Sequence, residues 1–196
     1  RAAPPLAVLG LLALPGAGGA HPHAFVDTDM RLVVRDGAVT AVDLTWRYDD
    51  FTSLLLLTDY GLDPDGDGAL MPAELDALRG FDTRDWPADF EGDLYLTAAD
   101  GDSVALGPPE PLAIAVEDGQ IVATHRRPVP DVPAQGLTVR QFDPTYYVAY
   151  TLRAPVRVDG PCVGAIDRHD PEAAARGVEQ ELTTIPEDRF EAMEVG

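Results

Sequence analysis

Residues 26–48 read VDTDMRLVVRDGAVTAVDLTWRY, and this stretch decides the fold. Apolar and polar residues alternate along it, which is typical of β-strands with one buried face. Asp36-Gly37 separates the two alternating runs, and an Asp-Gly pair suits a type I′ turn because both central residues need a positive φ. The stretch therefore predicts a β-hairpin, with buried faces formed by Val26, Met30, Leu32 and Val34 on one strand and by Val42, Leu44, Trp46 and Tyr48 on the other.

The same turn signal occurs twice more along the chain. Asp100-Gly101 separates apolar runs at 94–96 and 104–106, and Asp118-Gly119 separates runs at 112–116 and 121–122. A later alternating run covers residues 146–152. We predict an α+β fold, mainly an antiparallel β-sheet or sandwich of seven to nine strands.

Two further segments are predicted to be helical. Asp49 or Asp50 can cap a helix over residues 51–60. A C-terminal helix is expected over residues 171–182, because Pro171 and Glu172 are favourable in a first helical turn.

The chain of 196 residues carries 34 acidic and 14 basic side chains, a formal net charge of −20. This charge argues against nucleic acid or an anionic membrane surface as a partner. The hydrophobic fraction of 45% excludes intrinsic disorder. Most of the negative charge lies between Tyr48 and His125, a segment with eighteen acidic residues and two arginines. This segment tolerates or needs negative charge, and a solvated acidic surface that aids solubility accounts for most of these residues.

Residues 1–20 are typical of a cleaved signal peptide, with Arg1, an apolar run over residues 6–14 and small residues before position 21. The apolar run is too short to span a bilayer. We therefore expect an exported, periplasmic protein whose residues 21–196 form a single domain.

Cleavage after Ala20 would expose the sequence His21-Pro22-His23. Two imidazoles and a free amine suit zinc, nickel or copper. Pro22 has no backbone N–H to lose, which excludes the square-planar N-terminal chelate. His21 can bind through its amine and ring, or His21 and His23 can join a larger site with His125 and His169. The alternatives are a frayed polar terminus, an ordinary strand residue at His125 and an exposed turn residue at His169.

Residues 63–74 read DPDGDGALMPAE and match the twelve-residue calcium loop of an EF-hand. Closely spaced carboxylates repel one another unless a cation lies between them, so we expect a Ca²⁺ site within an EF-hand-like insertion at about residues 50–79. The alternative is an acidic turn without an ion. The predicted ligands are Asp63, Asp65, Asp67, the carbonyl of Ala69, and Glu74.

Sequence motifs for catalysis are scarce. Ser53 and Ser103 are the only serines, and neither lies in a nucleophile elbow. The sequence has no zincin helix, phosphate loop or dinucleotide glycine pattern. We therefore expect a protein that is not an enzyme. Cys162 is the only cysteine, which suggests a free thiol or a missing partner.

Five segments follow one another along the chain: HPHAFVD, LTWRYDDFTSLLLL, DPDGDGALMPAEL, LGPPEPL and QFDPTYYVAYTL. Their order resembles a family of bacterial periplasmic proteins catalogued as a domain of unknown function, number one thousand and seven. That family is labelled the periplasmic component of an ABC-type transport system and includes ZevA-like zinc-import proteins. The resemblance covers nearly all of the chain from His21 onward.

The resemblance implies an accessory of a polytopic inner-membrane permease for zinc, nickel or cobalt, with His21 and His23 touching the metal. It also implies truncation at the C-terminus, since similar proteins continue beyond Gly196 with a final strand. A cysteine there would be the disulfide partner of Cys162. The alternative is a calcium-stabilised exported structural or interaction module with no transport role. An enzyme with an N-terminal histidine copper site rests on His21 alone.

Overall fold

The first hairpin forms as its sequence predicts. In the computed structural model, which describes residues 22–64, 70–87, 90–145 and 147–166, Asp36 and Gly37 have φ values of 50° and 81°. The two strands pair antiparallel from Val26 opposite Tyr48 to Arg35 opposite Ala38. Asp118 and Gly119 repeat this geometry in a second hairpin, with φ values of 53° and 81°.

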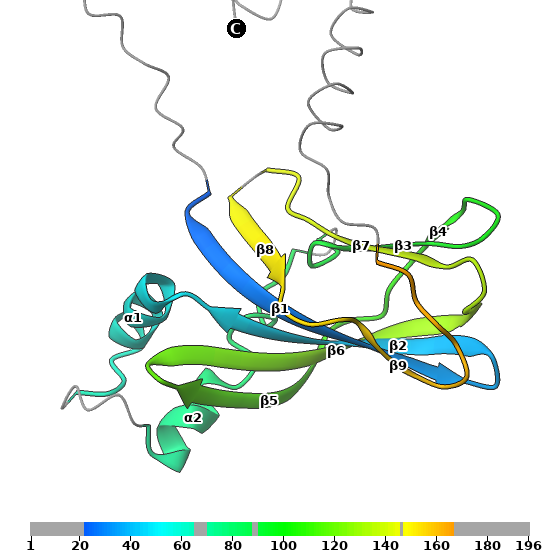
Figure 1. The fold of residues 1–196 in the computed structure, drawn as a ribbon. Helices are drawn as coiled ribbons and strands as arrows, with labels where there is room; N and C mark the ends of the chain where they lie inside the picture. Colours follow the sequence, from blue (N-terminus) through cyan, green and yellow to red (C-terminus); the bar gives the residue numbers. More distant parts are fainter. Residues whose placement is uncertain (1–21, 65–69, 88–89, 146, 167–196) are drawn as a thin grey trace, which may run out of the picture. The chain divides into compact units, whose positions relative to one another are not determined.

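Nine strands and two helices occur in the described ranges (Figure 1). In chain order they are β1 (Ala24–Arg35), β2 (Ala38–Tyr48), α1 (Asp50–Asp59), α2 (Pro72–Leu78), β3 (Leu94–Thr97), β4 (Ser103–Val104), β5 (Glu110–Glu117), β6 (Gln120–Pro133), β7 (Thr138–Gln141), β8 (Val148–Leu152) and β9 (Arg157–Asp159). A six-stranded sheet has the order β5-β6-β2-β1-β8, with β9 also paired to β1. A three-stranded sheet has the order β4-β3-β7.

The prediction of a mainly antiparallel sheet is confirmed, with two exceptions at β1. Ala24 pairs with Val148 of β8, and Arg31 pairs with Arg157 of β9, both in parallel. Alternation along a strand specifies which side chains are buried and carries no information on strand direction. The sequence pattern could therefore not predict these pairings.

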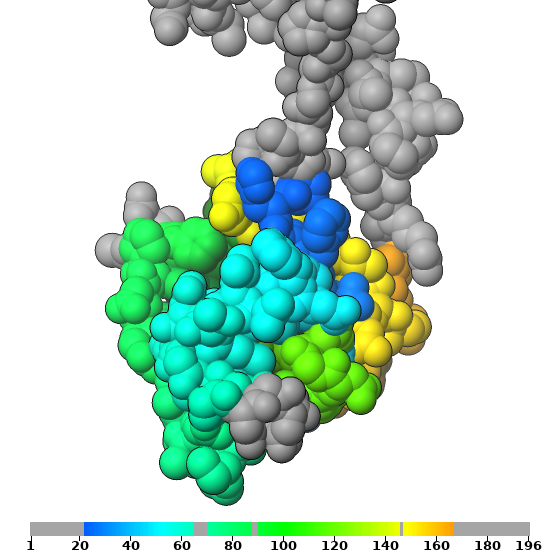
Figure 2. All heavy atoms as spheres, turned by 90° about the vertical axis from the view of Figure 1, so that its left-hand side faces the viewer, coloured from blue at the N-terminus to red at the C-terminus, as the bar shows by residue number. Residues whose placement is uncertain are grey.

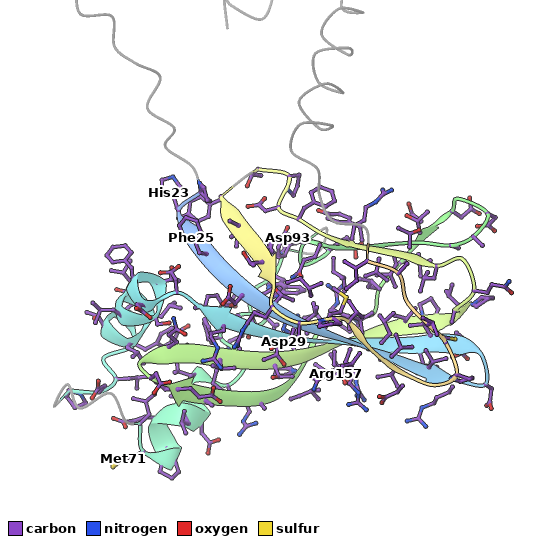
Figure 3. The ribbon with its side chains drawn as sticks, viewed as in Figure 1. His23, Phe25, Asp29, Met71, Asp93 and Arg157 are labelled. Carbon is purple, nitrogen blue, oxygen red and sulfur yellow. The ribbon has the colours of Figure 1, made fainter. Side chains whose placement is uncertain are left out.

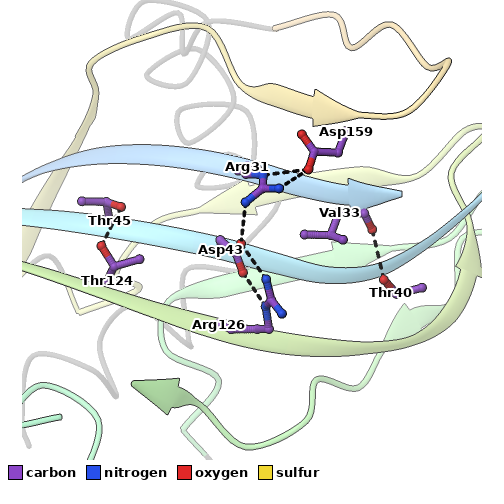
Figure 4. A network of polar contacts seen from close by, with 8 residues as sticks. All are labelled: Arg31, Val33, Thr40, Asp43, Thr45, Thr124, Arg126 and Asp159. Atoms are coloured by element: carbon purple, nitrogen blue, oxygen red, sulfur yellow. Dashed lines mark hydrogen bonds and ion pairs between the residues drawn. The ribbon is translucent and has the colours of Figure 1, made fainter. Parts of the chain in front are cut away.

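The two sheets share one apolar core. Val42 and Leu44 of β2 are fully buried, and Leu94 and Leu96 of β3 pack in the same cluster. The opposite face of β2 carries a polar network instead (Figure 4), in which the Asp43 carboxylate accepts hydrogen bonds of 2.7 and 2.9 Å from Arg126. Alternation along β2 thus separates an apolar side from a charged side, as predicted.

Helix α1 begins where the sequence predicts, with Asp49 as its N-cap. The Asp49 carboxylate accepts from the amides of Thr52 and Phe25, both at 2.9 Å. Burial alone would raise the pKa of Asp49, and these hydrogen bonds outweigh burial and lower it. Leu57 of α1 packs with Leu78 of α2 and Ile121 of β6 in a second apolar cluster. Both helices are thereby fixed against the sheet.

The chain divides into two compact units, residues 1–162 and 163–196, and all the named elements belong to the first. The predicted signal peptide and the predicted helix over 171–182 fall outside the described residues, as do residues 65–69 of the acidic loop. In the parts of the chain that the structure describes, no helix is both long and apolar enough to cross a membrane.

Candidate functional site

The start of β1 brings the predicted histidine segment against the segment that precedes β8. The His23 amide donates to the Tyr147 carbonyl at 2.8 Å, and the two rings lie 4.9 Å apart between centroids. His23 is exposed and lies at the end of β1 together with Phe25 (Figure 3). Parallel pairing of β1 with β8 thus joins two segments more than 120 residues apart in the sequence.

Asp143 sets the conformation of the segment that holds Tyr147. Its carboxylate accepts hydrogen bonds from the amides of Thr145, Tyr147 and Val148, at 2.7, 2.8 and 2.8 Å. Burial would raise the pKa of Asp143, and the bonds from Thr145 and these amides lower it below its ordinary value. Asp143 therefore carries a negative charge at neutral pH.

Tyr147 and Asp143 form part of a pocket of about 450 Å³. The pocket is open to solvent on one side and combines aromatic with acidic side chains. Its lining residues are Phe90, Glu91, Asp93, Tyr95, Asp143, Pro144, Thr145, Tyr147 and Val148. We refer to it below as the acidic pocket.

Asp93 forms the most buried part of this lining, with only 3% of its surface exposed. It adopts a left-handed backbone conformation with φ of 56°, and its Oδ2 accepts from the Tyr150 hydroxyl at 2.8 Å. Burial raises the pKa of Asp93 to about 6. The hydrogen bond from Tyr150 opposes this shift, and the negative charge of Asp143 adds to it. Burial together with the charges of Asp93 and Asp143 also raises the pKa of Tyr95.

The buried Arg127 side chain contacts Glu91 in the lining of the acidic pocket. It is 2% exposed, donates from Nε to the Gly107 carbonyl at 3.0 Å, and places Nη2 3.5 Å from the Glu91 carboxylate. Its guanidinium carbon lies 5.1 Å from the Trp86 ring centroid, within cation–π range. Burial lowers the pKa of Arg127, and the negative charge of Glu91 partly offsets this shift. Because Arg127 balances only one of the three pocket carboxylates, the pocket keeps a negative potential that attracts cations.

His125 lies in the core and is not among the residues that line this pocket. It is 1% exposed, packs edge-on against Trp46 with centroids 4.6 Å apart, and has Nδ1 3.5 Å from Asp82 Oδ2. His125 is opposite Leu44, which is opposite Met30, seven residues along β1 from His23. At about 3.3 Å per residue this separation is roughly 20 Å. The structure therefore does not bring His125 and His23 together.

The acidic loop is described only at its two ends. Asp63 has a φ of 53°. Glu74 lies in the first turn of α2, where its Oε2 accepts from the Met71 amide at 2.7 Å. The other predicted calcium ligands, Asp65, Asp67 and Ala69, lie outside the described residues.

The predicted metal site is likewise described only in part, because His21 and His169 also lie outside the described ranges. Within those ranges, no three His, Cys, Asp or Glu side chains are close enough to hold a metal ion together. A site of three or more such ligands that includes His23 would therefore need at least one ligand from outside the described ranges, such as His21 or His169, or from another molecule. Cys162 is a partly buried free thiol.

Sequence reasoning missed the acidic pocket, whereas the structure supports the alternative that His125 is an ordinary strand residue. Nothing in the pattern of QFDPTYYVAYTL indicates that this segment pairs with HPHAFVD. The left-handed Asp93 after Gly92 resembles the other Asp-Gly turns, but the order of the two residues is reversed, and the hairpin signal does not cover it.

One comparison with known proteins is informative. A family model described as a protein of unknown function (DUF1007) matches residues 6–196. No curated protein matches the chain. The match covers almost the whole sequence and confirms the resemblance seen in its motifs, so the chain belongs to the DUF1007 family of proteins of unknown function.

Proposed function

We propose that this protein is a periplasmic metal-binding accessory of a transport system for zinc, or for nickel or cobalt, and that His21 and His23 bind the metal. The observation that carries the proposal is the contact between His23 and Tyr147, which holds the histidine segment beside the acidic pocket. Because the pocket carries uncompensated carboxylates, it raises the local concentration of cations next to the histidines.

The chemistry of the histidine segment suits a borderline cation. Neutral imidazole nitrogens bind zinc, nickel and copper, and His21 adds the amine of the mature N-terminus. Pro22 prevents the backbone amide from joining the coordination sphere. His21 and His23 thus offer at most three nitrogens, which leaves coordination positions open for other ligands or for a partner.

Calorimetry with Zn²⁺ on protein that begins at His21 tests the metal site. We expect His21→Ala with His23→Ala to abolish binding, and an extra alanine before His21 to weaken it by removing the amine chelate. Glu91→Gln with Asp93→Asn should weaken binding at low salt, while the matched pair Asp100→Asn with Asp102→Asn, in the exposed β3–β4 turn, should not. Zinc binding that persists without His21 and His23 would overturn the proposal.

We also propose an inner-membrane polytopic metal permease as the partner. Support for this step comes from the family resemblance. Metal uptake by cells that contain the permease should fall when this protein is deleted, and should not recover with the His21→Ala, His23→Ala variant. Full recovery of metal uptake with that variant would show that transport does not depend on His21 and His23.

For the acidic loop we propose a calcium site of EF-hand type, formed by Asp63, Asp65, Asp67, Ala69 and Glu74 between α1 and α2. The clustering of Leu57, Leu78 and Ile121 supports a stabilising role, because the loop connects the two helices that form this cluster. We expect a dissociation constant on the order of 10⁻⁴–10⁻³ M, as in extracellular modules. Thermal unfolding should shift upward at millimolar Ca²⁺ in the natural protein and not in Asp65→Asn.

The second candidate function is a calcium-stabilised structural or interaction module without a transport role. The same helix cluster favours it, since calcium would stabilise α1 and α2 irrespective of the histidines. A calcium-dependent rise in the unfolding temperature together with no Zn²⁺ binding supports this alternative over the transport accessory.

A further inference from the structure

Helix α1 presents an apolar surface to solvent. The exposed fractions of Phe51, Leu54 and Leu55 are 65%, 60% and 47%, at spacings i, i+3 and i+4 that place them on one side of the helix. Phe25, 55% exposed, lies beside the start of α1, since its amide is bound by the Asp49 cap. Figure 2 shows α1 in cyan next to the first residues of β1 in blue on one face of the molecule. We call these four side chains the apolar face.

The apolar face is not needed to hold α1 in place. Its opposite side does this, through Leu57 in the second apolar cluster and through Ser53, whose Oγ accepts from the Ile121 amide at 3.0 Å. The Asp49 cap fixes the N-terminal end of the helix. Burial of each large apolar side chain would stabilise the fold further. The fold leaves this stabilisation unused at four neighbouring positions.

The size of the apolar face is that of an interaction surface. Four large side chains exposed by about half or more present on the order of 500 Å² of apolar area, near the largest patches that single soluble proteins expose. A helix with anchors at i, i+3 and i+4 fits an apolar groove on a partner protein.

The charged residues around the apolar face indicate which kind of partner can bind there. Asp49, Asp50 and Asp59 flank the apolar face, and the sequence has no basic residue between Arg47 and Arg79. A second copy would bring like charges together, in a chain with a net charge of −20, and an anionic bilayer would repel the same aspartates. A groove with arginine or lysine at its rim complements them.

We propose that the apolar face of α1 and Phe25 docks into an apolar groove, rimmed by arginine or lysine, on a partner protein. This inference goes beyond metal binding and does not depend on it. Phe25 follows His23 by two residues, at the start of β1 (Figure 3). The docked partner therefore lies next to the histidine segment.

Photo-crosslinking in the natural host tests the docking. A benzophenone amino acid replaces Leu54 or, as a matched control, Leu112, a leucine of β5 that is 42% exposed. We expect a discrete adduct with one other protein from position 54 only. The crosslinked peptide of that protein should border an apolar groove with basic residues at its rim.

Purified components then measure the contact. Leu54→Glu with Leu55→Glu should keep the unfolding temperature of the natural protein and weaken binding to the identified partner at least about 30-fold, as for hot-spot residues. Asp50→Arg with Asp59→Arg should also weaken binding, and reversal of the partner's rim charges should restore it. A variant that unfolds is replaced by Leu54→Gln alone.

Several outcomes overturn the proposal. These are an adduct between two copies of this chain, adducts with lipid, equal adducts from Leu54 and Leu112, and unchanged affinity of the Leu54→Glu, Leu55→Glu variant for the captured protein. Zn²⁺ binding should be the same in this variant and in the natural protein. Failure of the docking surface is therefore distinguishable from failure of the metal site.

Discussion

Gly92 connects two carboxylates of the acidic pocket, Glu91 and Asp93, and substitution by alanine should reveal how tightly this wall is packed. Gly92 has a φ of +70°, and a Cβ added to it would lie 2.5 Å from Cζ3 of Trp86 and 2.8 Å from Nη1 of Arg127. Real Cβ atoms essentially never approach heavy atoms within 3.0 Å. The Trp86 ring or the Glu91–Asp93 backbone must therefore move.

The magnitude has two parts. An alanine at positive φ costs about 1 kcal/mol, and overpacking of a rigid site costs about 1–3 kcal/mol more. Gly37 is the matched control, because its φ is +81° and nothing lies within 4 Å of its Cβ position. We expect Gly92→Ala to lower the free energy of unfolding by about 2–4 kcal/mol, against about 1 kcal/mol for Gly37→Ala.

Urea unfolding followed by tryptophan fluorescence, with calcium removed, measures both variants. A Trp86→Leu background removes the contact with the ring and leaves the one with Arg127, so the extra cost of Gly92→Ala over Gly37→Ala should be smaller there than in the natural background. If the two glycine variants agree within about 0.5 kcal/mol in the natural background, the packing of Trp86 against Gly92 is not as described, and the argument from this contact fails.

Three further predictions follow from single carboxylates. Because the pKa of Asp93 is raised to about 6, the folded state binds its proton more tightly than the unfolded chain, so stability should fall as the pH rises from about 4 to about 6. Asp93→Asn should remove this slope in pH-dependent urea unfolding and leave the variant the more stable protein above pH 6; an unchanged slope would contradict the assignment. Asp49→Ala removes the cap of α1 and should lower the unfolding free energy by about 1 kcal/mol. Since the pKa of Asp49 is lowered, its contribution is present at neutral pH and lost as the pH falls through the folded-state pKa, so the natural protein and the variant should converge in acid. Asp43→Asn weakens the bidentate contact with Arg126 and should cost about 1–2 kcal/mol by thermal unfolding, whereas Asp102→Asn in an exposed turn should cost almost nothing.

Local features of the fold could be predicted from sequence because they depend on few neighbouring residues. Asp36-Gly37 and Asp118-Gly119 specify their turns through φ, and Asp49 specifies a helix start through one side-chain hydrogen bond. Alternation along β2 separates Leu44 in the core from Asp43 on the charged face. Each of these features is encoded within about ten residues.

The candidate site could be predicted only in part, because it depends on contacts between distant segments. The HPH segment indicated a ligand-binding terminus, and nothing near it in the sequence specifies Tyr147 as its contact. The acidic pocket joins residues 90–95 with residues 143–148, and no periodicity links the two. His125 shares the alternation of β6, which is equally compatible with a ligand and with the core residue that the structure shows.

The parallel pairing of β1 with β8 has a consequence for the order of folding. β1 meets β2 through a two-residue turn, whereas Ala24 meets Val148 only after a loop of 124 residues has closed. A long loop closes late in folding, because the chain loses conformational entropy before it gains the stabilising contact. A nascent chain that stops before residue 148 can therefore form the first hairpin without positioning His23. The position of His23 beside the acidic pocket thus depends on completed folding of the chain.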